Sequence, residues 1–532
     1  MLAKLYGMVL HGVEAFRVTV EVSVAPGLGY FITGQPDDTV RESLSRVEVA
    51  IKTLGYYMPR TKISVNLSPA HVPKTGAGFD LPIAIGVLLA SEQLFDQDRL
   101  GRYIITGELG LDGSIYPVRG ALCIACQAQK EKITGIILPA DNAAEARLVA
   151  GLDVIGISHL REGLAFLNGV ANTLQPAPAS LPRSAGDPSS NSQPRTAALP
   201  EIHPETDTVP DFKDVHGQEQ IKRTLEIAAA GGHNTLLVGP PGVGKTMLAK
   251  RLPSILPPMT DQEILETSRL HSLAGMHLSG LVTTRPFRAP HHTASDVALT
   301  GGGSLPLPGE ISLAHNGVLF LDELYEFQRS AIEILRQPLE EGRIRIARAK
   351  LSLEYPAAFM LVAAMNPCFC GYYGSKTRDC TCSRRALEFY RRKAGGPLLE
   401  RIDLHIQAEP VPLFEWAVDS MTPESSATIR ERVVKARQLQ ADRYAAFPGI
   451  HCNARMPEQQ LENFCALDLN SRSFLLARID LLQLSARSYS RILKVSRTIA
   501  DLAGSQAIEL NHIAEAVSLR CLDMPLKPSK QK

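Results

Sequence analysis

The sequence predicts an α/β protein built around a parallel sheet. An apolar run at Leu236–Val238 leads into a glycine-rich turn and then into a helix-forming stretch. Two later apolar runs, Val318–Leu321 and Phe359–Met365, each end in polar side chains. Strands of a parallel sheet read as continuous apolar runs because helices cover both faces. Alternation of such strands with helical patterns along the chain favours the α/β class.

Length and composition limit the choice of protein class. A chain of 532 residues is too long for one core, so we expect two to four domains. A net charge of +1 gives no bulk indication of a nucleic-acid or membrane partner, so any basic surface must be local. Without an apolar run of about 18 residues or a signal core, we expect a cytoplasmic protein with no membrane span. The odd count of nine cysteines fits a reducing compartment.

Residues 1–172 are predicted to form a first α/β domain. Residues 16–24 alternate apolar and polar side chains, which is typical of a half-buried strand. Further strands are expected at 62–67, 103–109 and 135–139, with helices at 39–54 and 81–94.

The rest of the chain divides into four predicted segments. Residues 173–210 are rich in proline, serine and alanine with little apolar content, so we expect a flexible linker. Residues 211–415 hold the nucleotide motifs and are expected to form the core. Residues 416–524 show helical periodicity and are expected to form a helical lid domain, followed by a disordered tail at 525–532.

The glycine-rich turn matches the phosphate-loop pattern Gly-x4-Gly-Lys-Thr between a strand and a helix. Glycines let backbone N–H groups surround a triphosphate, and the following helix presents its positive end to the phosphates. We expect Lys245 to reach the β- and γ-phosphates and Thr246 to bind Mg²⁺. The predicted ATP-binding residues are Gly239, Pro240, Pro241, Gly242, Val243, Gly244, Lys245 and Thr246.

Polar residues at the ends of the other two apolar runs complete the predicted site. Asp322 is expected to bind Mg²⁺, and Glu323 to orient and deprotonate the attacking water. Asn366 closes the third run and suits a sensor that positions this water.

These features, in this order, resemble the AAA+ ATPases, and the whole chain is similar to the YifB/ComM group of magnesium-chelatase-like AAA+ proteins. The most specific segments are Arg285–Thr293, Met365–Gly371 and 397–405. The resemblance implies that Arg401 reaches the γ-phosphate of a neighbouring subunit in a hexameric ring. It also implies that Arg487 is a second sensor of the γ-phosphate. Ordinary surface ion pairing is the alternative for both arginines.

The first domain resembles the proteolytic domain of Lon proteases, which implies a Lon-protease-like (ribosomal S5 domain 2-like) fold. The similarity rests on 74–80 and 107–118. Laid on the family pattern, the serine nucleophile falls on Gly78 and the lysine base on Leu122, and neither can do that chemistry. We therefore expect the fold without peptidase activity; a protease with shifted residues is the alternative. Cys123 and Cys126 are expected to be buried thiols rather than a redox or zinc pair.

Two basic segments are candidates for contact with DNA. Period-2 alternation over 342–354 predicts a protruding β-hairpin with Arg343, Arg345, Arg348 and Lys350. Related hexameric DNA motors carry a DNA-contacting hairpin at this place, whereas a merely solvated face is the alternative. The second segment holds Arg285 and Arg288, and a pore loop and a subunit contact are equal alternatives there.

The cysteine pairs Cys368-x-Cys370 and Cys380-x-Cys382 supply four thiols of the kind that hold structural zinc. The spacing within each pair is tighter than usual, so reduced thiols without a metal are the alternative.

The family resemblance implies an ATP- and Mg²⁺-dependent helicase, a homo-hexamer that drives branch migration of recombination intermediates during natural transformation. Its partners would be DNA, recognised without regard to sequence, and recombination proteins. The alternatives are a chelatase-like chaperone that remodels a protein partner without DNA, and a Lon-like assembly whose first domain is a scaffold for protein substrates.

Overall fold

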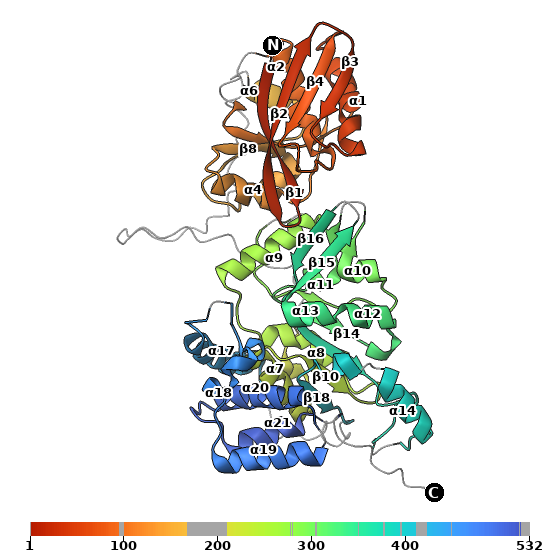
Figure 1. The fold of residues 1–532 in the computed structure, drawn as a ribbon, viewed down its shortest axis with the longest axis vertical. Helices are drawn as coiled ribbons and strands as arrows, with labels where there is room; N and C mark the ends of the chain where they lie inside the picture. Colours follow the sequence, from red (N-terminus) through yellow and green to blue (C-terminus); the bar gives the residue numbers. More distant parts are fainter. Residues whose placement is uncertain are drawn as a thin grey trace, which may run out of the picture. The chain divides into compact units, whose positions relative to one another are not determined.

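The computed structural model describes residues 2–94, 100–167, 210–276, 278, 280–303, 306–348, 351–375, 378–393, 396–410, 423–447, 449–482, 484–520 and 522. Residues 173–209 of the predicted linker and the predicted tail at 525–532 lie outside these ranges. The chain forms two compact units (Figure 1). Unit 1 comprises 1–203, 264–283 and 304–307, and unit 2 comprises 204–263, 284–303 and 308–532. Among the described helices, none has the length and apolar character needed to cross a bilayer.

Unit 1 is built on a mixed seven-stranded sheet in the order β3-β4-β2-β1-β5-β8-β9. The antiparallel pairs are β1 with β2 and β2 with β4, and the other neighbours are parallel. The strands are β1 (Leu2–His11), β2 (Glu14–Ala25), β3 (Gly29–Thr33), β4 (Lys62–Ser68), β5 (Tyr103–Ile105), β8 (Gly135–Pro139) and β9 (Asp153–Ile157). A short hairpin joins β6 (Glu108–Leu109) to β7 (Ile115–Tyr116).

Helices cover both faces of this sheet. The alternation in β2 buries Val18, Val20 and Val22 on the face covered by α1 (Asp38–Thr53) and α2 (Asp80–Ala90). The other face packs on α4 (Ala121–Lys130), through residues such as Leu122, and on α5 (Ala140–Ala146). The first domain also contains α6 (Leu160–Leu167). The predicted α/β class of this domain is therefore confirmed.

Residues 264–283 contribute to unit 1, although they lie inside the predicted core range 211–415. They include most of α9 (Asp261–Leu273). Ser272 accepts a backbone hydrogen bond from Gly120 at 3.1 Å, and Leu281 joins the apolar cluster around α4. This segment therefore packs on the helix that carries Leu122.

Unit 2 contains the predicted parallel sheet, in the order β11-β14-β17-β10-β18. The strands are β11 (Phe287–Arg288), β14 (Val318–Leu321), β17 (Met360–Met365), β10 (Thr235–Val238) and β18 (Leu404–Gln407). All four pairings are parallel, and every residue of β10, β14 and β17 is buried. Parallel strands end at one edge of a sheet, so the polar residues that follow β10, β14 and β17 are brought together.

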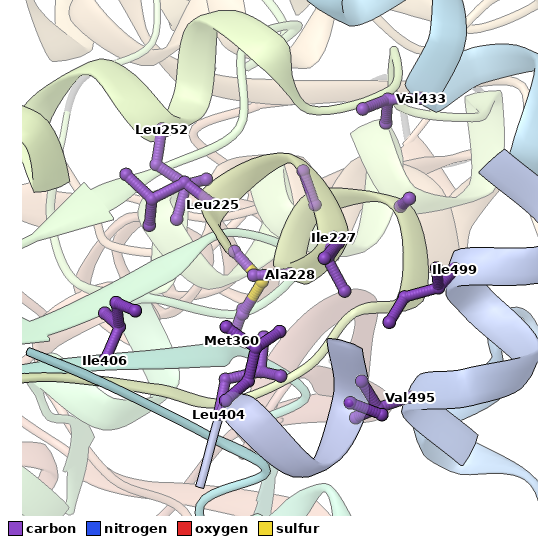
Figure 2. Packing of buried hydrophobic residues seen from close by; sticks show 14 of the residues in the cluster. Leu225, Ile227, Ala228, Leu252, Met360, Leu404, Ile406, Val433, Val495 and Ile499 are labelled. Atoms are coloured by element: carbon purple, nitrogen blue, oxygen red, sulfur yellow. The ribbon is translucent and has the colours of Figure 1, made fainter. Parts of the chain in front are cut away.

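Helix α7 (Glu219–Gly231) connects this sheet to the helical part of unit 2. Figure 2 shows Leu225, Ile227 and Ala228 of α7 among side chains of the sheet, of α8 (Lys245–Ile255) and of the C-terminal helices. Ala228, Ala229 and Ala230 are fully buried, and their small side chains let the packed elements approach closely. Each fully buried Leu or Ile in this cluster contributes about 1.5–3 kcal/mol.

The C-terminal helices belong to the same apolar cluster as the sheet. They are α17 (Ser426–Arg443), α18 (Leu461–Phe464), α19 (Leu469–Leu482), α20 (Ala486–Leu502) and α21 (Leu510–Ser518). The described part of unit 2 also contains α10 (Asp296–Thr300), α11 (Glu310–Leu313), α12 (Arg329–Ile334), α13 (Arg336–Glu341), α14 (Arg384–Lys393) and α15 (Gly396–Leu399). Short strands β12 (Gly301–Gly302) and β13 (Leu307–Pro308) also pair.

The predicted basic hairpin is present. Strands β15 (Arg343–Arg348) and β16 (Leu351–Pro356) pair antiparallel in a sheet of their own. One face is anchored by buried Ile344 and Tyr355, whereas Arg343 and Arg345 lie on the exposed face.

Candidate nucleotide-binding site

The phosphate loop joins β10 to α8, as predicted. Gly242 and Gly244 have φ angles of 82° and 86°, a left-handed conformation that favours glycine. A Cβ on Gly239 would lie 2.7 Å from the backbone oxygen of Ala408, so only glycine fits there. Helix α8 begins at Lys245, which directs its N-terminal N–H groups toward the loop.

Lys245 lies buried within this loop. Its Nζ donates to the carbonyl oxygens of Gly239 at 2.6 Å and Pro240 at 3.0 Å, and to Oδ1 of Asn366 at 3.2 Å. Burial lowers the pKa of this ammonium, and the nearby Asp322 and Glu323 carboxylates oppose the change. The two predicted phosphate-sensing groups, Lys245 and Asn366, are therefore in direct contact.

The two predicted Mg²⁺ ligands also meet. The hydroxyl of Thr246 donates to Oδ2 of Asp322 at 2.5 Å, across 76 positions of sequence. The other carboxylate oxygen, Oδ1, accepts the backbone N–H of Glu323 at 2.9 Å. A hydroxyl and a carboxylate oxygen are the hard ligands that Mg²⁺ prefers, and they lie beside the phosphate loop. These residues fit the ion.

Glu323 adopts a left-handed backbone with φ 50°, which is uncommon for a residue other than glycine. Its side chain is 58% exposed, and one oxygen lies 3.4 Å from Nδ1 of His292. The ring of His292 lies against that of His291 in a tilted arrangement, with ring centroids 4.1 Å apart. Sequence reasoning did not predict the contact between His292 and Glu323, because the two residues lie far apart in the chain, in the segments that follow the paired strands β11 and β14.

A cluster of aromatic rings contacts the backbone of Asn366. It was not predicted from the sequence. Tyr325 stacks on Tyr390 with centroids 3.8 Å apart, and Phe369 packs edge-on against both rings. The Tyr390 hydroxyl donates to the backbone oxygen of Asn366 at 2.9 Å. This cluster connects the segment after Glu323 with the segment after Asn366.

Arg401 and Arg487 line one pocket, together with Glu340, Glu458, Ser490, Arg491 and Lys494. Arg401 pairs with Glu340 at 2.5 Å, and the exposed Arg487 pairs with Glu400 at 3.2 Å. The lining of this pocket includes no residue of the phosphate loop. The structure thus brings the two predicted phosphate-contacting arginines together at a second place in unit 2.

The predicted DNA-contacting residues fall into two groups. Arg343 and Arg345 are more than half exposed and share one carboxylate, Glu354, at 2.7 and 3.2 Å. Arg285 donates to Glu263, Pro257 and Asn316, and Arg288 makes two 2.6 Å bonds to Glu310. Arg285 and Arg288 are thus each paired with a glutamate of unit 2, and these ion pairs join segments within that unit. Lys350 lies outside the described residues, as does the side chain of Arg348.

The four predicted zinc ligands Cys368, Cys370, Cys380 and Cys382 converge, with their sulfur atoms all within 4.8 Å of one another. In unit 1, by contrast, Cys123 and Cys126 are buried in the α4 helix, as predicted. Burial raises the pKa of the Cys123 thiol to about 12. A thiol with so high a pKa is unreactive at neutral pH.

The two positions that a Lon-type dyad would occupy carry no catalytic side chain. Leu122 is fully buried in the core of the α4 face. A side chain on Gly78 would place its Cβ 2.9 Å from the Thr106 hydroxyl oxygen, so the backbone there leaves little room.

Comparison with known proteins agrees with this architecture. The family described as magnesium chelatase, subunit ChlI, matches residues 211–415; subunit ChlI of Mg-chelatase matches 20–142; and the magnesium chelatase ChlI C-terminal family matches 423–520. The chain is 42% identical over 520 residues, 96% of each chain, to the uncharacterized protein YifB of Escherichia coli. It is 42% identical over 523 residues, 98% of each chain, to the competence protein ComM of Haemophilus influenzae. A partial match, 29% identical over 178 residues, covers 31% of the chain and 22% of Lon protease 1 of Sorangium cellulosum.

The fold and the site therefore place the protein in the class of magnesium-chelatase-like AAA+ ATPases. Within that class, the chain belongs to the YifB/ComM family.

Proposed function

We propose that this protein is an ATP-driven DNA motor, a hexameric ring that promotes branch migration of recombination intermediates during natural transformation. The observation that carries the ATPase part is the meeting of Lys245, Thr246, Asp322 and Asn366 at one sheet edge. The link to transformation comes from the relative named competence protein ComM. In this proposal the protein works in the cytoplasm with recombination proteins as partners.

Each residue at the sheet edge has a chemical task in the proposed ATP hydrolysis. Lys245 would bind the β- and γ-phosphate oxygens. Thr246 and Asp322 would hold a Mg²⁺ ion, which would neutralise the charge that develops on the phosphate. Glu323 orients the attacking water and accepts its proton. Asn366, held by Lys245 through its side chain and by Tyr390 through its backbone, positions the same water.

The pocket of Arg401 and Arg487 supports a shared active site in the ring. Both arginines line a pocket whose lining includes no residue of the phosphate loop, and each makes an ion pair, Arg401 with Glu340 and Arg487 with Glu400. We propose that this pocket faces the nucleotide of a neighbouring copy, where the two cations stabilise charge on the transferred phosphoryl group. Hydrolysis would then require the closed ring.

The hairpin supplies the proposed DNA contact. Exposed pairs such as Arg343–Glu354 contribute about 0–1 kcal/mol, so a phosphate can replace the carboxylate at little cost. Contacts of this kind bind DNA without sequence preference and weaken with salt. We leave Arg285 and Arg288 out of the proposed surface because their guanidinium groups are already engaged.

The test measures ATP turnover with and without DNA. We expect DNA to stimulate turnover, and the double variant Arg343→Ala/Arg345→Ala to lose the stimulation while keeping the basal rate. Arg329→Ala is the matched control, since Arg329 is an 89% exposed arginine that also pairs with a glutamate. Normal basal turnover with no effect of DNA on the unaltered protein would contradict the proposal and favour a chelatase-like chaperone.

A further inference from the structure

The four cysteines that follow Asn366 have the geometry of a closed metal site. The sulfur atoms of Cys368 and Cys370 are 3.3 Å apart, those of Cys368 and Cys380 are 3.7 Å apart, and those of Cys370 and Cys380 are 3.5 Å apart. With Zn–S bonds of about 2.3 Å, a tetrahedral site sets the sulfur atoms about 3.8 Å apart. The cluster therefore encloses a space of the size that one zinc ion fills.

The surrounding backbone is arranged to stabilise sulfur in its anionic form. The N–H of Tyr373 donates to Sγ of Cys368 at 3.3 Å, and the N–H of Cys382 donates to Sγ of Cys380 at 3.4 Å. Gly371 has φ 83°, so the chain turns back at once after the first pair. This turn makes a Cys-x-Cys pair converge despite its short spacing.

The alternatives fit these contacts less well. Four neutral thiols gain little from one another, because S–H is a weak donor and sulfur a weak acceptor. Four thiolates at these distances repel unless a cation lies between them. Tetrahedral sulfur sites bind zinc or iron–sulfur centres, but a cluster with inorganic sulfide needs its cysteines farther apart than a single ion does.

The cysteine loop touches the nucleotide site at two places. A Cβ on Gly371 would lie 2.9 Å from Cδ of Pro241, so the turn lies directly against the phosphate loop. Phe369, between the first two cysteines, packs on Tyr390, whose hydroxyl binds the backbone of Asn366. A shift of the cysteine loop would therefore move both Pro241 and Asn366.

We propose that Cys368, Cys370, Cys380 and Cys382 bind one Zn²⁺ ion, which fixes the loop that supports Pro241 and Asn366. The ion is structural, since four protein ligands leave no open position for a substrate. Its binding is independent of the proposed function, whereas its effect on the nucleotide site rests on the proposed ATPase activity.

The first test is the metal content of the full-length protein, measured by mass spectrometry for zinc and iron together. We expect about one zinc per chain and no iron. The variants Cys370→Ser and Cys380→Ser should lose most of the zinc, and Cys452→Ser, a buried cysteine of unit 2 outside the cluster, should keep it. Protein without zinc, iron in its place, or equal zinc in all variants would overturn the proposal.

Two further measurements use the unaltered protein, so they do not depend on whether the cysteine variants fold. In the unaltered protein, exchange of zinc for Co²⁺ should give the visible absorption bands of a tetrahedral cobalt–thiolate centre. Weak bands typical of octahedral cobalt would also overturn the site.

The second measurement is the affinity for a fluorescent ATP analogue before and after zinc is removed with a chelator. We expect about a tenfold loss that added Zn²⁺ reverses, within the roughly 5–150-fold range that is typical of coupling between two binding sites. Unchanged affinity after complete zinc removal would refute the support of the nucleotide site. Because neither measurement uses DNA or turnover, these outcomes are independent of the helicase proposal.

Discussion

The nucleotide site of unit 2 and positions 78 and 122 of unit 1 show two fates of functional positions in α/β folds. In unit 2, Lys245 is buried but donates three hydrogen bonds, and Asp322 accepts two. In unit 1, Leu122 is fully buried with its side chain in an apolar cluster, and Gly78 offers no side chain at all. Burial therefore indicates a functional site only where the buried group is polar and has hydrogen-bond partners.

Among the variants proposed here, replacement of Glu323 by Gln should have the largest effect, which is a loss of ATP turnover at the nucleotide site of unit 2. Glutamine has nearly the same shape but cannot accept the proton of water, so turnover should fall about 10³-fold while ATP affinity stays within a few-fold. Single-turnover kinetics and equilibrium binding check the two quantities. A variant that keeps a tenth of normal turnover would remove Glu323 from the role of base.

Replacement of Leu122 by Lys tests whether position 122 of unit 1 is an apolar packing position. An ammonium at this position would lie in an apolar cluster, and the nearby Glu145 carboxylate already accepts the backbone N–H of Leu122 at 3.1 Å. Unit 1 should therefore lose about 3–5 kcal/mol of stability and gain no peptidase activity. Leu122→Met conserves volume and polarity and should cost less than about 1.5 kcal/mol. Denaturant unfolding gives the free energy of unfolding of both variants. A Lys variant as stable as the Met variant would show that this position accommodates a charge.

Replacement of Glu354 by Gln should have the smallest effect on stability. It tests an exposed charge, in contrast to the buried Lys245 and Leu122. Loss of two exposed ion pairs should change stability by less than about 1 kcal/mol. DNA affinity should rise several-fold at low salt, because the competing carboxylate is gone, and the gain should vanish at high salt. Titration of labelled DNA at two salt concentrations measures it; weaker binding would contradict a phosphate-binding hairpin.

Much of the fold follows from local sequence. The fully apolar runs before Gly239, Asp322 and Asn366 predict buried parallel strands, and the alternation at 342–354 predicts the hairpin. Since parallel strands end together, the meeting of Thr246 with Asp322 also follows from the pattern. The family resemblance adds Arg401 and Arg487, which no local pattern singles out.

Other features depend on contacts that the sequence does not encode locally. Strand β1 was not predicted: Leu5 and Val9 pack on one face and Met8 on the other, so the strand lacks a clear alternation. Nothing in the sequence of 264–283 indicates that it packs with unit 1. The contact of His292 with Glu323 and the stacking of Tyr325 on Tyr390 join segments that meet only once the sheet is assembled.

We propose that ATP is hydrolysed between two copies of this chain, and the activity of a mixture of two inactive variants tests this proposal. Lys245→Ala removes the phosphate-binding side of the site, and Arg401→Ala removes the side offered to a neighbour. Each variant alone should be inactive. Equal mixtures, after subunit exchange, should regain up to about a quarter of normal turnover, because one interface in four pairs two intact sides. A mixture that stays inactive although mass measurement shows mixed rings, or an Arg401→Ala protein that is fully active alone, would contradict the account.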